Sequence, residues 1–272
     1  MNYNYQLAVP SYKRAETFRD KTCALLERHD VDPARVSLFL ASEEEMEKYK
    51  VALKKTKYAH GFNFAVGTPG MGAIRNYIQT YYPEGTAVMN LDDDLSDVME
   101  KISDKKMESL KDGTFQEKVV LRGFEECRAH GANLFGVYAA ANAMFMKHRV
   151  AVGLYYCIGS CWGVITRHDD DLRVTLDDKE DFERTLQHFV KDGRVVRLDD
   201  ITVKSKYYTE DGGMQVTRTT DRIRESAEIL AARYPNLCTM YTRETTGHAE
   251  LRLRASRQGA DSVGGASLDS FF

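Results

Sequence analysis

Residues 87–95 read AVMNLDDDL, an uncharged, largely apolar run followed at once by three aspartates. The run predicts a buried strand. Open α/β sheets bind ligands in the crevice beyond the carboxyl ends of their strands. Asp92, Asp93 and Asp94 repel one another, so their clustering favours a bound cation, and hard oxygen ligands suit Mg²⁺ or Mn²⁺. The segment therefore predicts a strand that ends in a metal site, with an exposed acidic turn as the alternative.

The residues before this stretch alternate between strand and helix patterns. Short apolar runs predict strands, and apolar residues at helical spacing predict helices. The predicted strands cover residues 6–9, 36–41, 62–66 and 87–91, and the predicted helices cover residues 15–29 and 43–54 and pass through Ile74 and Ile78. This alternation predicts a parallel sheet of the nucleotide-binding type.

The second half of the chain is less regular. Its patterns predict helices over residues 117–129 and 179–190 and strands over residues 134–139 and 163–166. We expect one α/β domain over residues 1–254, a Rossmann-type mixed sheet flanked by helices. Its donor-binding half would be residues 1–100 and its acceptor half residues 101–254. Residues 255–272 are rich in Gly, Ser and polar residues and predict a flexible tail.

Composition excludes several classes of protein. A formal net charge of -3 and a pI near 6.2 do not mark a polyanion binder. The five cysteines form no CxxC pair, which favours reduced thiols in a cytoplasm. The start has no basic segment before an apolar run, and no stretch approaches the ~18 apolar residues of a membrane span. We expect a cytoplasmic protein without a membrane segment.

Two further segments suit the same crevice. Pro10, Ser11, Tyr12 and Arg14 follow the first strand, where a loop can contact a base or ribose and an arginine can meet phosphate. Arg75 lies within about one turn of a glycine-opened helix start, which would set it beside the crevice. An ordinary surface loop is the alternative for the first segment.

Other motifs argue for simpler roles. The sequence has no Walker loop, no GxSxG nucleophile elbow around Ser160 and no HExxH zinc pattern. The second acidic triplet, residues 169–171, precedes LRVTL and predicts a polar turn in a hairpin. Asp177 or Asp178 predicts an N-cap for the following helix.

Four segments occur together in a characteristic order: LAVPSYKR at residues 7–14, PGMGAIRN at 69–76, AVMNLDDDL at 87–95 and KEDFERTL at 179–186. In this order the chain resembles GT-A glycosyltransferases over about residues 6–250. It is similar to the branch associated with TET/JBP hydroxylases, which includes the base J glucosyltransferase and bacteriophage enzymes that glycosylate hydroxymethylated pyrimidines in DNA.

The resemblance implies a nucleotide-sugar donor, a UDP-sugar, bound with Mn²⁺ or Mg²⁺. Asp92 and Asp94 match the outer acids of the DXD motif: Asp92 would lie towards ribose and metal, with Asp93 beside the donor, and Asp94 would bind the metal directly. His248 is the candidate for a further metal ligand, and a structural histidine is the alternative. The donor loop implied is Pro10, Ser11, Tyr12 and Arg14, with Arg75 near the phosphates.

Glu180 and Asp181 match the acidic position below the acceptor. A carboxylate there can accept the hydroxyl proton as the sugar is transferred, and Asp181 is the first choice for this base. Helix capping is the alternative, and a reaction that retains anomeric configuration needs no such base.

The implied acceptor is double-stranded DNA with a hydroxymethylated pyrimidine, which would have to be extruded from the duplex. Candidate contacts are Lys204, Lys206, Tyr207 and Arg218, with a second arginine-rich set further on. Three alternatives stay open: a non-DNA acceptor, a nucleotidyltransferase that releases pyrophosphate, and a non-catalytic DNA-binding protein with salt-dependent binding.

Overall fold

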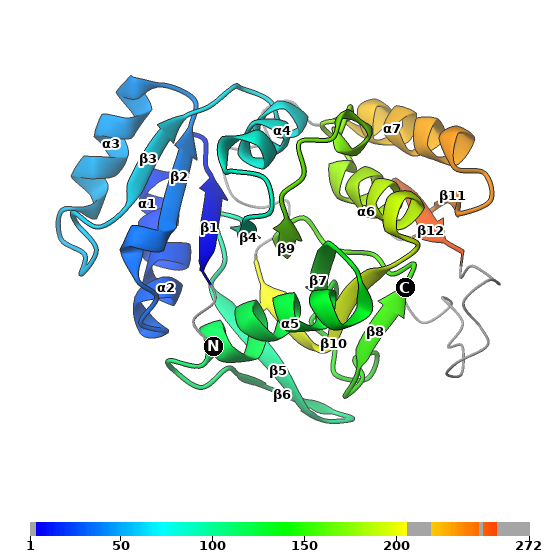
Figure 1. The fold of residues 1–272 in the computed structure, drawn as a ribbon, viewed down its shortest axis with the longest axis horizontal. Helices are drawn as coiled ribbons and strands as arrows, with labels where there is room; N and C mark the ends of the chain where they lie inside the picture. The colour runs from blue at the N-terminus through cyan, green and yellow to red at the C-terminus, as the bar shows by residue number, and fades with distance from the viewer. Residues whose placement is uncertain (1–3, 206–218, 245–246, 255–272) are drawn as a thin grey trace.

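One edge of the main sheet consists of four parallel strands in the order β3-β2-β1-β4 (Figure 1). The structure, a computed structural model, describes residues 4–205, 219–244 and 247–254. Side chains along β1 alternate between the two faces, with Leu7 and Val9 on one and Ala8 on the other. The strands are β1 Tyr5–Pro10, β2 Val36–Leu40, β3 Asn63–Val66 and β4 Ala87–Leu91.

The rest of the sheet mixes strand directions. β9 (Cys161–Ile165) runs antiparallel to both β4 and β7 (Leu134–Tyr138), and β7 is parallel to β10 (Val195–Lys204). The start of β10 pairs with β8 (Val150–Gly153), and its end pairs with β5 (Asp97–Ser103), which is followed by β6 (Lys106–Ser109). The register of β10 against β7 shifts between Leu198 and Thr202. On its other side, β10 pairs with β8 before this shift and with β5 near its end.

Helices cover both faces of the sheet. The helices form two groups, because each group packs against a different buried cluster. One cluster includes Phe18, Tyr49 and Phe124, and the other includes Ile78 and Leu186. The first face carries α1 Ala15–Phe18, α2 Ala24–Arg28, α3 Glu43–Leu53 and α5 Arg122–His130, with π-helical turns Arg19–Cys23 and Gln116–Leu121 and the 3₁₀ turn Pro33–Arg35. The second carries α4 Met71–Tyr81, α6 Glu180–Asp192 and α7 Thr220–Arg233, beside the small sheet of β11 Cys238–Thr242 and β12 Ala249–Leu253.

Phe135 on β7 shows how closely the layers approach. Its ring is fully buried between Gly123 of α5 and Gly163 of β9. A β-carbon added at Gly163 would lie 2.0 Å from Cε1 of this ring, and one at Gly123 would lie 2.3 Å from its Cε2. Glycine is required at both positions because only a hydrogen leaves room for the aromatic ring.

The predicted strands and helices of the first hundred residues are confirmed to within one residue of their bounds, and the predicted mixed second half is also confirmed. Two local predictions are wrong. Residues after the second acidic triplet form no hairpin: Asp170–Leu172 is a 3₁₀ turn capped by the Asp169 carboxylate. The N-cap of α6 is Lys179 in a left-handed conformation, because Asp177 instead accepts a hydrogen bond from the Gly72 amide.

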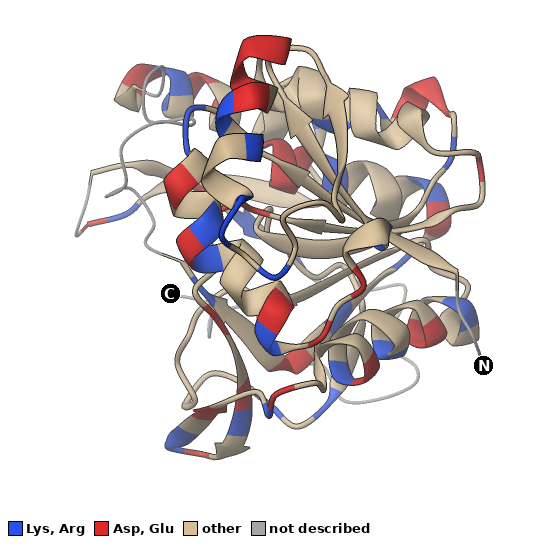
Figure 2. Cartoon of the chain, turned by 90° about the vertical axis from the view of Figure 1, so that its left-hand side faces the viewer, with Lys and Arg blue, Asp and Glu red and all other residues tan. Residues whose placement is uncertain are grey.

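The charged surface does not segregate by sign on the α3 side of the molecule. Figure 2 views this side and shows acidic and basic residues interleaved along the helices. On α3, Lys48 pairs with Glu44 and Lys50 with Glu47, both at 2.7 Å. Within the described residues, no helix is long and apolar enough to cross a membrane.

We expect Gly163→Ala to lower the free energy of unfolding by about 1–3 kcal/mol, because the new methyl group overlaps the Phe135 ring. Adding Phe135→Leu should recover part of this loss, since the two positions are in contact. Urea denaturation measures both effects. Val51→Ala on the exposed side of α3 is the control, and an unchanged Gly163→Ala midpoint would contradict the packing argument.

Candidate active site

The turn that carries the acidic triplet is fixed by backbone hydrogen bonds from two sides. The Asp92 amide donates to the Ser160 carbonyl at 3.0 Å. The Thr22 hydroxyl donates to the Asp92 carbonyl at 2.7 Å and accepts from the Leu95 amide at 2.9 Å. The turn beyond β4 is therefore held between the first helical segment and the loop before β9.

Asp93 points towards the loop that follows β1. The Ser11 hydroxyl donates to Asp93, so it accepts in turn from the Tyr49 hydroxyl at 2.5 Å. Tyr49 also accepts from the Arg14 amide at 3.1 Å, and the Arg14 guanidinium lies 3.3 Å from Asp93 Oδ1. Lys13 adopts a left-handed conformation here, and its amide donates to Glu45 at 2.9 Å. This network joins the predicted donor loop to the middle carboxylate.

Asp94 faces the end of β10. Its Oδ1 accepts a hydrogen bond from the Ser205 hydroxyl at 2.8 Å, and its Oδ2 lies 3.7 Å from Arg14. The Ser96 amide donates to the Lys204 carbonyl at 2.9 Å, which fastens the triplet turn to the same strand. The triplet turn thus connects β4 with the end of β10.

Asp92 meets a buried arginine. Arg75 on α4 donates from Nη2 to Asp92 Oδ1 at 2.9 Å and to the Gly159 carbonyl at 3.0 Å. Its Nε lies 3.5 Å from Glu180 Oε1, and Glu180 also pairs with Arg184. The Arg184 guanidinium stacks 3.6 Å from the centre of the Trp162 ring. Arg75 is 4% exposed, so its positive charge is nearly shielded from water and is paired with the carboxylates of Asp92 and Glu180.

Asp181 lies on the other side of Gly159. Its Oδ2 accepts hydrogen bonds from the Tyr156 hydroxyl and from the Gly159 amide, the latter at 3.3 Å. Tyr156 stacks on Phe182 with ring centres 4.1 Å apart. Gly159 therefore links the Arg75–Asp92 pair to Asp181, because its carbonyl accepts from Arg75 and its amide donates to Asp181.

Negative charge exceeds positive charge among these groups. Burial raises the pKa of Asp92 to about 7; Arg75 opposes the shift, and the charges of Asp94 and Asp93 add to it. Burial likewise raises the pKa of Asp93 to about 6 against the opposing effects of Ser11 and Arg14. In the part of the chain that the structure describes, three guanidiniums, those of Arg14, Arg75 and Arg184, pair with members of a group of five carboxylates: Asp92, Asp93, Asp94, Glu180 and Asp181.

The excess charge and the oxygen donors fit a divalent cation. Within the described residues, no donor contacts Oδ2 of Asp92, and Oδ2 of Asp94 meets only Arg14 at 3.7 Å. No group of three or more His, Cys, Asp or Glu side chains in that part of the chain could hold a metal by itself. Mg²⁺ is commonly held by one or two carboxylates together with substrate phosphates, so Asp92 and Asp94 would suffice with a diphosphate.

The remaining predicted residues have other surroundings. Pro10 ends β1, and Tyr12 is 38% exposed and lies against Lys13. His248 precedes β12 in the small sheet, where its carbonyl accepts from the Arg243 amide at 2.9 Å. Its role as a metal ligand stays a prediction. Lys204 is exposed at the end of β10. Lys206, Tyr207 and Arg218 lie outside the described residues, as does the predicted tail.

Sequence reasoning missed four side chains that hold the site together: Thr22, Tyr49, Tyr156 and Trp162. Each lies far along the chain from the group it contacts, so no short motif joins them. One signal was available, because the segment around Ser160 is rich in small residues. The sequence excludes a nucleophile elbow there, and in the structure the backbone of this segment supports both Asp92 and Asp181.

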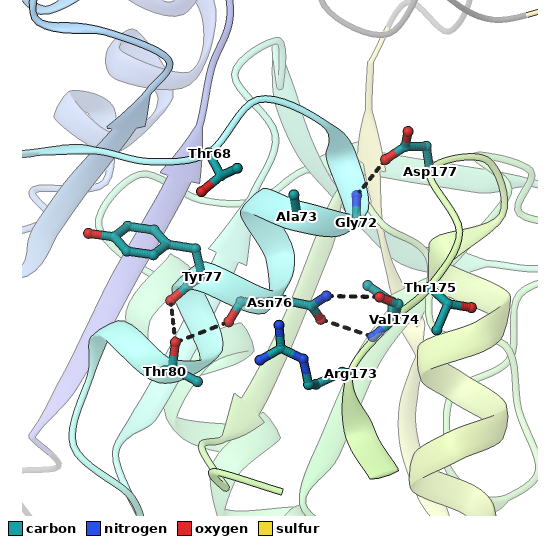
Figure 3. A pocket seen from close by; sticks show the side chains of 10 residues that line it. All are labelled: Thr68, Gly72, Ala73, Asn76, Tyr77, Thr80, Arg173, Val174, Thr175 and Asp177. Carbon is teal, nitrogen blue, oxygen red and sulfur yellow. Dashed lines mark hydrogen bonds between the residues drawn. The ribbon is translucent and has the colours of Figure 1, made fainter. Parts of the chain in front are cut away.

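A groove of about 500 Å³ lies beside the outer face of α4 (Figure 3). Asn76 spans it with paired hydrogen bonds to the Val174 backbone, at 2.8 and 2.9 Å. Arg75 and Asn76 are adjacent on α4 but contact different groups. Arg75 contacts the buried carboxylates, and Asn76 binds the segment before α6.

The mixed sheet with helices on both faces has the GT-A fold. Among solved structures, S. aureus TarS 1–349 is similar with a TM-score of 0.51 and 15% identity over 85% of this chain. The same protein in complex with UDP-GlcNAc gives a TM-score of 0.52 and 14% identity over 84% of this chain. The chain spans 65% of TarS 1–349 and 40% of the longer TarS chain. Neither a protein-family model nor a curated protein sequence matches the chain.

In metal-free buffer with EDTA, we expect Asp92→Asn to raise the free energy of unfolding at pH 8 by on the order of 1–2 kcal/mol. The folded-state pKa of Asp92, about 7, exceeds its ordinary value of 3.8, so the folded state holds the proton more tightly and stability falls as pH rises between the two values. Because the side chain is 33% exposed, we expect less than the full shift.

Urea denaturation at pH 5 and pH 8 tests this sign. Near pH 5 the wild-type carboxyl is largely protonated, so the difference between the two proteins should shrink. A variant that is less stable than wild type at pH 8 would show that the charged carboxylate is favourable in the fold.

Proposed function

We propose that this protein is a metal-dependent glycosyltransferase that moves a sugar from a nucleotide sugar, a UDP-sugar, to a hydroxyl group. The observation that carries the proposal is the meeting of Asp92, Arg75 and Asp181 around Gly159. In this arrangement Asp92 would belong to an acidic cation site, and Asp181 would be the nearby carboxylate that accepts a proton. The similarity to TarS, which was solved with UDP-GlcNAc and with UDP, supports the donor class.

The donor would lie along the carboxyl ends of β1 and β4. Pro10, Ser11, Tyr12 and Arg14 would contact its base and ribose. Asp92 and Asp94 would hold the divalent cation, which when bound neutralises the diphosphate as the nucleotide departs. Ser11 and Arg14 also hold Asp93, so donor binding and the shape of the acidic turn would be linked.

Asp181 is the residue we assign as the base. In an inverting transfer, the acceptor oxygen attacks the anomeric carbon, the bond to the diphosphate breaks, and the acceptor proton passes to the Asp181 carboxylate. Glu180 is less suited to this task because Arg184 and Arg75 already contact its two oxygens. We assign Glu180 the role of holding Arg75 beside Asp92.

The acceptor we propose is a hydroxymethylated pyrimidine in double-stranded DNA, with the sequence resemblance as support. Incubation with Mn²⁺, a panel of nucleotide sugars and DNA containing 5-hydroxymethylcytosine or 5-hydroxymethyluracil tests it by mass spectrometry of the digested nucleosides. A sugar mass increment supports the proposal. UDP released only with another acceptor would overturn the DNA part, and pyrophosphate released from a nucleoside triphosphate would indicate a nucleotidyltransferase.

We expect Asp94→Ala to lower metal-dependent turnover at least about a hundredfold, because one of the two proposed cation ligands is lost. Asp170→Ala, in the exposed 3₁₀ turn of the second acidic triplet, is the matched control and should stay close to wild type. Steady-state kinetics at several Mn²⁺ concentrations measure both variants. Full activity of Asp94→Ala would refute the metal assignment.

We expect Asp181→Asn to reduce kcat by about 10²–10⁴ while the donor affinity stays the same, since the amide cannot accept the acceptor proton. Calorimetric titration with UDP and Mn²⁺ measures the donor affinity. A variant that loses only thermal stability and keeps kcat would assign Asp181 to the support of Gly159 rather than to catalysis.

A further inference from the structure

The loop of residues 139–149, between β7 and β8, presents apolar side chains to solvent. Met144 is 71% exposed and Phe145 is 40% exposed, side by side in the chain. Lys147 and His148 follow and are also exposed. An exposed methionine and phenylalanine next to cationic side chains form a surface that can contact both bases and phosphates.

Hydrogen bonds and one buried side chain fix the backbone of this loop, while Met144 and Phe145 stay exposed. Met146 is buried at its centre. The Asn142 side chain accepts from the Met144 amide at 3.0 Å, and buried Lys101 donates to the Ala143 carbonyl at 2.6 Å. The Lys147 amide donates to the Asp199 carbonyl at 3.1 Å. A rigid loop of this kind loses little conformational entropy when a ligand covers it.

Positive charge predominates where the loop joins β8 and β10. Asp199 accepts from Arg149 at 2.8 Å and from Arg197 at 2.6 Å, so one carboxylate serves two guanidiniums. Arg197 is buried, while the Arg149 side chain is 31% exposed. Lys101, which pairs with Asp104 at 3.4 Å, and Lys147 add further charge. This region therefore carries an excess of positive charge, whereas the region around the acidic triplet carries an excess of negative charge.

The same region is connected to the proposed base. Both guanidiniums lie over the Tyr155 ring, Arg197 at 5.0 Å and Arg149 at 5.8 Å from its centre. The next residue, Tyr156, donates its hydroxyl hydrogen bond to Asp181. The cationic cluster and the acceptor side of the proposed active site therefore share one short segment.

We propose that the 139–149 loop is the docking surface for the DNA acceptor, with Met144 and Phe145 against unstacked bases and Lys147 and Arg149 on backbone phosphates. The inference rests on the proposed function, since it assumes the DNA acceptor. Apolar side chains that enter a base step help to unstack it, which is what exposure of a base in a duplex requires.

Fluorescence anisotropy tests this inference without donor or metal. The probe is a fluorescein-labelled duplex of about 20 base pairs with one 5-hydroxymethylcytosine, titrated between about 50 and 200 mM salt. We expect the double variant Met144→Ser, Phe145→Ser to weaken binding about fivefold or more. Lys147→Gln should reduce the slope of log affinity against log salt by about 1.

Val51→Ser and Lys48→Gln on α3 are the matched controls, and both should bind as wild type. Urea midpoints equal to that of wild type would show that the loop variants are folded. Loop variants that bind like the controls, or a wild-type protein that does not bind the duplex, would overturn the inference. Loop-dependent binding without sugar transfer would instead refute only the proposed function.

Discussion

The buried guanidinium of Arg75 is the group on which the arrangement of the site depends. It lies between Asp92 and Glu180 and also binds the Gly159 carbonyl, so three segments distant in sequence meet at one charge. A buried cation needs such partners because the cost of removing it from water is several kcal/mol. Because these partners come from the triplet turn, the loop before β9 and the start of α6, the three segments have to be positioned together.

The direction of β9 makes this meeting possible. β9 is antiparallel between β4 and β7, so residues just before it lie at the edge where β4 ends. The Ser160 carbonyl can then accept from the Asp92 amide while Gly159 reaches both Arg75 and Asp181. A purely parallel sheet would bring the start of this strand to the opposite edge. The reversal in the sheet thus joins the parallel strands of the first half to the segment that carries the proposed base.

The two halves of the proposed site differ in electrostatic character. Around the acidic triplet the charge is negative; burial, with a smaller effect of the neighbouring carboxylates, raises the pKa of Asp92 and Asp93, and this environment suits a divalent cation and a diphosphate. Beyond Tyr155 the charge is positive, with Arg149 and Arg197 sharing Asp199. This division fits the proposed reaction, in which a diphosphate donor would meet the acidic triplet and a polyanionic acceptor would meet the cationic cluster.

The sequence by itself determined the parallel first half of the sheet and the position of the acidic triplet, because strand and helix periodicity and adjacent carboxylates are local features. It also identified Ser11, Arg14, Arg75 and Asp181, which the structure brings to the same edge. Only the tertiary structure decided which partner each carboxylate takes: Asp93 takes Ser11, Asp92 takes Arg75 and Asp177 takes the α4 amide rather than its own helix. Local propensity cannot specify these pairings, since each joins residues far apart in sequence and depends on which groups are buried together.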